Sequence, residues 1–154
     1  MRKILAAILF CVLTAAAQSP AVRVSAVLDN WHRAAAVADE TAYFAHFSPD
    51  GVFMGTDATE RWSVKEFRAW ARPHFDAKKT WNFKPRDRHT AFSADGKTAW
   101  FDEMLDTEGL GICRGSGVLV NTAGQWKIAQ YNLSIPIPNE LVKGIVKEIA
   151  VGGK

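Results

Sequence analysis

Residues 97–135 read KTAWFDEMLDTEGLGICRGSGVLVNTAGQWKIAQYNLSI, and this stretch decides the fold class. It contains three segments rich in apolar residues, 97–107, 112–121 and 125–135, which are separated by short glycine-containing breaks. Segments of this length joined by tight turns are typical of antiparallel β-hairpins. The sequence therefore predicts three consecutive antiparallel strands.

Residues 81–92 add a further strand before this stretch. Pro85 lies inside it, and a proline favours an edge strand or a bulge because it cannot donate to a sheet ladder. The segment Ser93-Ala94-Asp95-Gly96 predicts the hairpin turn that follows. Four long strands in a row indicate one antiparallel sheet.

Three helices are predicted upstream of the strands. Apolar residues recur at steps of three and four over residues 24–38. Asp39 can cap a second, short helix, and Ser63 with Glu66 forms a capping box that begins a third. Pro73 is expected to end or kink this third helix. Helices followed by antiparallel strands indicate an α+β domain with the helices on one sheet face.

Two shorter features complete the expected order of elements. Residues 48–51 predict a turn that leads into a short strand at 52–54, before the third helix. After the last strand, Asn139 can cap a C-terminal helix, so that residues 139–154 form a helix and tail.

The first 17 residues have the pattern of a secretory signal peptide. Arg2 and Lys3 precede an apolar run, and Ala15-Ala16-Ala17 offers a cleavage site. Removal of this segment lowers the net charge from +3 to +1, because 17 basic and 16 acidic residues remain. We expect a periplasmic or secreted protein that binds no nucleic acid and, once cleaved, no membrane. Cys113 would then be the single cysteine, and we expect it to be a buried structural thiol.

Several motifs carry a resemblance to a known family. They are FMGTDATERW at residues 53–62 with FRAW at 67–70, WFDE at 100–103, CRGSGVL at 113–119 and GQWKIAQYN at 124–132. With the order of elements, they make residues 22–138 similar to the SnoaL-like branch of the nuclear transport factor 2-like superfamily. The resemblance implies a cone-shaped, strongly curved antiparallel sheet wrapped by three N-terminal helices. It also implies a homodimer through the sheet.

Strand alternation predicts which side chains face the hollow of the cone. Glu103 is expected to point inward, and Arg114 on the neighbouring strand is its expected partner, either in a purely structural ion pair or as part of a ligand site. The expected ligand-binding residues are His32, Tyr43, Trp62, Trp70, Phe101, Glu103, Arg114, Ser116, Gln130 and Asn132.

Three residues are candidates for catalysis, namely Glu103, Arg114 and Asp57. A carboxylate could act as a base while Arg114 stabilises negative charge, although Asp57 in its loop is also a good turn former. The four histidines have no metal-ligand spacing, so we expect no metal and no cofactor. His46 is expected to bond to carbonyl groups at a helix end.

Three functions therefore stay open at this point. The first is binding of a small, partly polar organic molecule in the cone. The second is an acid-base enzyme of the isomerase, dehydratase or hydrolase type. The third is a module for dimerisation, because the sheet face and the C-terminal helix could mediate assembly.

Overall fold

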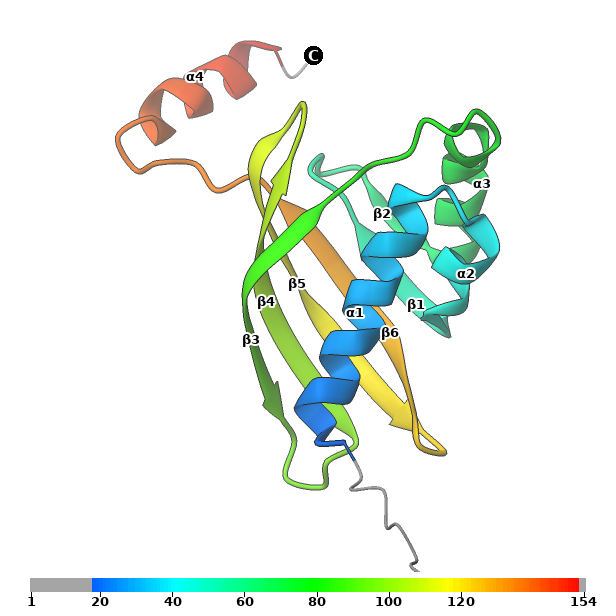
Figure 1. Ribbon diagram of the computed structural model, residues 1–154. Helices are drawn as coiled ribbons and strands as arrows, with labels where there is room; N and C mark the ends of the chain where they lie inside the picture. The colour runs from blue at the N-terminus through cyan, green and yellow to red at the C-terminus, as the bar shows by residue number, and fades with distance from the viewer. Residues whose placement is uncertain (1–17, 153–154) are drawn as a thin grey trace, which may run out of the picture.

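The computed structural model describes residues 18–152, so the predicted signal peptide at 1–17 lies outside the described residues. A six-stranded sheet with the order β2-β1-β6-β5-β4-β3 is covered on one face by helices (Figure 1). The elements are α1 (Pro20–Ala36), α2 (Glu40–Ala45), β1 (Phe47–Met54), β2 (Arg61–Ser63), α3 (Val64–Asp76), β3 (Lys84–Phe92), β4 (Thr98–Thr107), β5 (Gly111–Thr122), β6 (Gln125–Ser134) and α4 (Val142–Gly152).

The N-terminal helices begin at side-chain caps. Ser19 Oγ accepts a hydrogen bond from the Val22 N–H of α1, and Asp39 Oδ1 accepts one from the Ala42 N–H of α2. Ser63 and Glu66 form the predicted capping box of α3. α3 continues three residues beyond Pro73 rather than ending there, because Phe75 is buried and holds the last turn against the core.

The sheet is strongly curved and mixed. The four long strands pair antiparallel as predicted, and β1 joins them by running parallel to β6, which makes the whole sheet mixed. β1 is also longer than expected, since it includes the predicted turn at 48–51 as an irregular segment between Phe47 and Val52. Pro85 lies on β3, which is an edge strand, as the sequence indicated.

A bulge in β6 changes which side chains face the helices. Leu119 pairs with Ile128, whereas its neighbour Val118 pairs with Gln130, so β6 has one extra residue at this point. Trp126 and Ile128 are buried before the bulge, and Tyr131 and Leu133 are buried after it. The expectation that Gln130 and Asn132 point into the cone is therefore wrong.

The inward face of β5 consists largely of small residues. Cys113 is fully buried, as predicted, and burial raises the pKa of its thiol. Gly115 and Gly117 share its face, so the intervening Arg114 and Ser116 lie on the outer face, contrary to expectation. A methyl group on Gly115 would collide with the hydroxyl of Tyr131. Glycine at this position lets the Tyr131 ring cross the floor of the cone.

A buried ionic cluster connects the sheet to α1. Glu103 on β4 has no exposed surface. Its Oε2 accepts a hydrogen bond from Arg88 Nε at 2.7 Å, and its Oε1 lies 2.8 Å from His32 Nε2. The Tyr131 hydroxyl donates to Oε1 at 3.4 Å. Side chains from α1, β3 and β6 therefore meet at one carboxylate.

Arg88 extends the cluster along α1. Its Nη1 donates to the Ser25 carbonyl at 3.2 Å and lies 2.8 Å from a carboxylate oxygen of Asp29. The predicted pairing of Glu103 with Arg114 is wrong, because β5 turns Arg114 outward and the edge strand β3 supplies Arg88 instead.

The contacts of Glu103 determine its ionisation. Burial acts to raise the pKa of this carboxyl, but His32 and Arg88 outweigh burial and hold its pKa below the ordinary value of 4.5. The ionised carboxylate therefore contributes stability above pH 4.5, and this contribution is lost as the pH falls through the lower pKa of the folded state.

We predict that Glu103→Gln lowers the free energy of unfolding by about 3 kcal/mol at neutral pH, because Arg88 and His32 lose their buried counter-ion. The variant should also lose less stability than the wild type when the pH falls below 4.5. Urea unfolding at a series of pH values measures both effects, with the exposed Glu140→Gln as control. Parallel pH profiles for Glu103→Gln and the wild type would contradict this account of the cluster.

Candidate functional site

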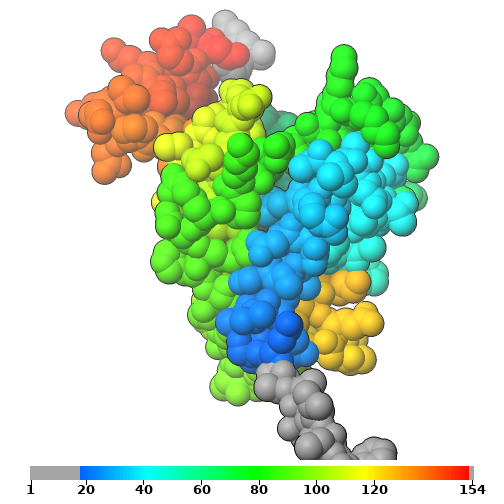
Figure 2. All heavy atoms as spheres, in the orientation of Figure 1, coloured from blue at the N-terminus to red at the C-terminus, as the bar shows by residue number. Residues whose placement is uncertain are grey.

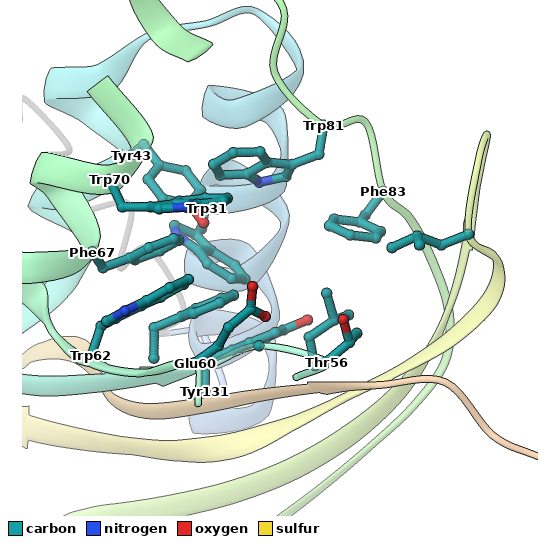
Figure 3. Close-up of a pocket in the computed structure, with 14 residues that line it drawn as sticks. Trp31, Tyr43, Thr56, Glu60, Trp62, Phe67, Trp70, Trp81, Phe83 and Tyr131 are labelled. Atoms are coloured by element: carbon teal, nitrogen blue, oxygen red, sulfur yellow. The ribbon is translucent and has the colours of Figure 1, made fainter. Parts of the chain in front are cut away.

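An aromatic cavity of about 190 Å³ lies between the helices and the sheet (Figure 3). Its walls come from the helices α1, α2 and α3, the strands β1, β2 and β6, the β1–β2 and β4–β5 connections, and the segment before β3. The lining residues are Trp31, Tyr43, Phe53, Gly55, Thr56, Glu60, Trp62, Phe67, Trp70, Trp81, Phe83, Leu110, Tyr131 and Leu133.

Several rings of the wall are nearly parallel. Phe53 and Phe67 stack with their centroids 4.0 Å apart and their planes 11° apart. Trp62 continues the stack beside Phe67 at an angle of 6°, and Tyr131 lies at 6° to Phe53. Rings stacked in this way line the cavity with apolar aromatic surface, which is a common wall of small-molecule sites.

The cavity opens to solvent at one end. Trp70 and Leu110 line it and are 44% and 45% exposed, whereas Trp31 and Tyr43 are almost completely buried. Leu110 belongs to the turn between β4 and β5, and Trp70 belongs to α3. The mouth therefore lies between this turn and α3.

Two buried donors lie at the deep end of the cavity. The Trp31 Nε1–H and the Tyr43 O–H have no hydrogen-bond acceptor within residues 18–152. Burial raises the pKa of Tyr43 well above 10, and the neighbouring Trp81 opposes this only in part, so the hydroxyl keeps its proton. A buried donor without an acceptor costs about 1–3 kcal/mol, and the two groups are thus ready to bond an acceptor on a ligand.

One carboxylate lines the same cavity. Glu60 follows the loop after β1, and the loop is closed by a hydrogen bond from the Gly55 N–H to the Glu60 carbonyl at 2.9 Å. The side chain of Glu60 folds over Gly55 so closely that a methyl group on Gly55 would collide with the Glu60 carboxylate. The Asp57 N–H donates to Oε2 at 3.2 Å. The loop therefore holds the carboxylate of Glu60 at the cavity (Figure 3).

The structure places the predicted ligand-binding residues in three groups. Tyr43, Trp62 and Trp70 line the cavity. Phe101 is buried beneath it, with its ring 5.9 Å from that of Tyr131, and His32 and Glu103 belong to the buried cluster. The remaining four lie outside the cone on the outer sheet face, and they are Arg114, Ser116, Gln130 and Asn132.

The structure also separates the three catalytic candidates. Glu103 does not reach the cavity, and Arg114 lies on the opposite sheet face. Asp57 is exposed, and its Oδ1 accepts hydrogen bonds from the Thr59 hydroxyl at 2.6 Å and the Thr59 N–H at 2.8 Å. These bonds lower the pKa of Asp57. They are also the bonds of a residue that stabilises a turn, which is the structural role that the sequence offered as the alternative to catalysis.

Sequence reasoning missed several cavity residues. Trp31 was visible only as part of the apolar stripe of α1, and Tyr131 was hidden by the bulge in β6. The sequence feature that could have indicated Glu60 as a site residue is an acidic residue soon after a glycine, in the loop that follows a strand.

Among residues 18–152, no group of three His, Cys, Asp or Glu side chains is placed to hold a metal ion. No helix in this part of the chain is long and apolar enough to span a membrane.

Several solved structures have a similar fold at low sequence identity. An NTF2-like protein of unknown function from Pseudomonas putida KT2440 aligns with a TM-score of 0.63 and 14% identity, over 80% of this chain and 93% of that chain. A proposed dehydratase from the NTF2-like family of Streptomyces avermitilis aligns with a TM-score of 0.65 and 14% identity, over 77% and 97%. A proposed ketosteroid isomerase from Shewanella frigidimarina aligns with a TM-score of 0.59 and 17% identity, over 73% and 94%.

These similarities show the fold, and they do not transfer an activity. No curated protein matches this sequence. The profile of the SnoaL-like domain matches residues 24–138, which is most of the chain. On this match, the chain belongs to the SnoaL-like domain family, and it shares the fold of the NTF2-like proteins.

Proposed function

We propose that the protein binds a small, flat organic molecule that carries a hydrogen-bond acceptor such as a carbonyl oxygen. The observation that supports this most directly is the pair of donors, Trp31 Nε1–H and Tyr43 Oη–H, buried without partners at the deep end of an aromatic cavity. Aromatic walls with a few convergent polar groups are the usual composition of small-molecule sites.

The size of the cavity limits the ligand. A cavity of about 150 Å³ holds a benzene molecule, so a volume of about 190 Å³ suits one substituted ring. The ring would lie against Phe53 and Phe67, and its oxygen would accept hydrogen bonds from Tyr43 and Trp31. Larger molecules would extend through the mouth beside Trp70.

A second candidate function is acid-base catalysis on the same ligand. Glu60 lines the cavity together with the two donors, so a carboxylate and an oxygen-binding pair share one site. In this scheme Glu60 accepts a proton from the carbon next to the carbonyl, the electron pair forms an enolate, and Tyr43 and Trp31 stabilise the oxygen. Where the ligand has a C=C bond beside that carbon, the enolate is a dienolate, and return of the proton to its far carbon would give an isomerase, the class proposed for the Shewanella frigidimarina protein.

We predict that acetophenone binds more tightly than ethylbenzene, since both have one ring of similar size and only the ketone offers an acceptor. Tyr43→Phe should reduce this difference about fivefold, because it removes one donor and keeps the ring. Ligand-observed NMR titration measures the affinities, and Trp100→Phe on the outer face is the control. Equal affinities of the wild type for the two compounds would contradict the proposal.

The enzymatic alternative has a separate test. If Glu60 acts as a base, the protein should accelerate deuterium exchange at the methyl group of acetophenone in D2O, and Glu60→Gln should slow this exchange about a hundredfold. NMR follows the loss of the methyl signal. Binding without exchange above the buffer rate would eliminate the acid-base function and leave the binding function intact.

Export and self-association through the outer sheet face stay predictions. N-terminal sequencing of the protein purified from the cells that produce it should find a chain that begins near Gln18, and an intact Met1 would contradict export.

Sedimentation of the protein should find a dimer, and a monomer at high concentration would contradict association through the sheet.

A further inference from the structure

A second hollow lies at the other end of the cone from the cavity. It is a groove of about 580 Å³ between the start of α1, the end of α2 and the turn between β5 and β6. This turn and the β4–β5 turn, which borders the cavity, are at opposite ends of β5 (Figure 1). In Figure 2 the same region lies where the blue start of α1 meets the yellow and orange β5–β6 turn. The lining residues are Arg23, Val27, Ala42, Ala45, His46, Gly124, Gln125, Trp126 and Lys127.

The charged groups of the groove all have the same sign. Arg23 and Lys127 are cationic, His46 can become so, and no Asp or Glu is among the lining residues. Burial lowers the pKa of His46, and the nearby cations Lys127 and Arg33 lower it further, while bonding to the Ala42 and Tyr43 backbone acts in the opposite direction. The groove therefore has a positive potential that favours an anion.

Two donors of the groove lack acceptors. Trp126 is 5% exposed, and its Nε1–H has no hydrogen-bond partner in the described part of the chain. The Arg23 Nε–H also has no hydrogen-bond partner in that part of the chain. Both groups are donors and cannot accept a hydrogen bond. By contrast, Lys127 Nζ donates to the Ala45 carbonyl and His46 Nδ1 donates to the Ala42 carbonyl, each at 2.6 Å. The unused bonding capacity is thus concentrated in Arg23 and Trp126.

The other walls of the groove are apolar. Val27 and Ala42 line the groove together with Trp126, so a ligand that fills the groove meets aliphatic and aromatic surface as well as the cationic side chains. A fully hydrated inorganic ion would leave that surface uncovered. An organic anion with a short apolar body fits both kinds of wall.

We infer that this groove is a binding site for a small organic carboxylate, separate from the aromatic cavity. The carboxylate oxygens accept hydrogen bonds from the Arg23 guanidinium and the Trp126 indole N–H, and Lys127 and His46 add to the attraction. The planar guanidinium matches the planar carboxylate, and charge-assisted bonds of this kind are the strong ones. The apolar body of the ligand covers Val27 and the Trp126 ring.

Benzoate tests the assignment, with benzyl alcohol as its uncharged counterpart and inorganic phosphate as an anion without an apolar body. The reporter is His46, whose ring signals are followed by NMR as the pH changes. Benzoate should bind and raise the pKa of His46, because an anion stabilises the protonated ring. Arg23→Gln should weaken benzoate binding about tenfold, and added salt should weaken it as well.

Two further variants separate general charge from hydrogen bonding. Arg114→Gln removes an exposed cation on the outer sheet face and should leave the effect of benzoate on His46 unchanged. Trp126→Phe keeps an aromatic ring and removes the N–H, and it should weaken benzoate but not benzyl alcohol. Melting temperatures confirm that each variant folds.

Four results would overturn the inference. They are no effect of benzoate on His46, equal binding of benzoate and benzyl alcohol as measured at His46, equal losses in Arg23→Gln and Arg114→Gln, and binding of phosphate without binding of benzoate. Because His46 lines the groove and not the aromatic cavity, failure of this test leaves the proposed function untouched.

Discussion

The buried charge of Glu103 is the constraint on which the arrangement of the helices depends. An isolated carboxylate in an apolar interior would be strongly unfavourable, so partners must surround it. The chain supplies them from three elements, namely His32 from α1, Arg88 from β3 and Tyr131 from β6. Because Arg88 also bonds to Ser25 and Asp29 of α1, the cluster determines how this helix lies on the sheet.

The position of α1 in turn determines the cavity. Trp31 is next to His32 in the chain, so fixing His32 on Glu103 also fixes the indole that ends the cavity. Tyr131 contributes its hydroxyl to the cluster and its ring to the cavity wall. The cluster is therefore a supporting layer beneath the site, and the chemistry that a ligand meets comes from Tyr43, Trp31 and Glu60.

The sequence predicted the α+β class, the helix caps, the order of elements and the family, because capping boxes, apolar periodicity and hairpin turns are local signals. Of the predicted ligand-binding residues, Tyr43, Trp62 and Trp70 line the cavity. The prediction of side-chain orientation failed where one extra residue in a strand changes which side chains face the helices. The bulge in β6 reversed the orientation of Gln130 and Asn132, and no local signal marks it. The pairing of Glu103 with Arg88 rather than Arg114 depends on which face of β5 is inward.

A crystal structure of the protein grown with a small aromatic ketone would show whether the cavity holds a ligand oxygen between Tyr43 and Trp31. We expect ligand density along the ring stack of Phe53 and Phe67, with its oxygen within about 3 Å of both Tyr43 Oη and Trp31 Nε1. A ketone that binds outside the cavity, or one whose oxygen points to the mouth while both donors stay without an acceptor, would contradict this expectation.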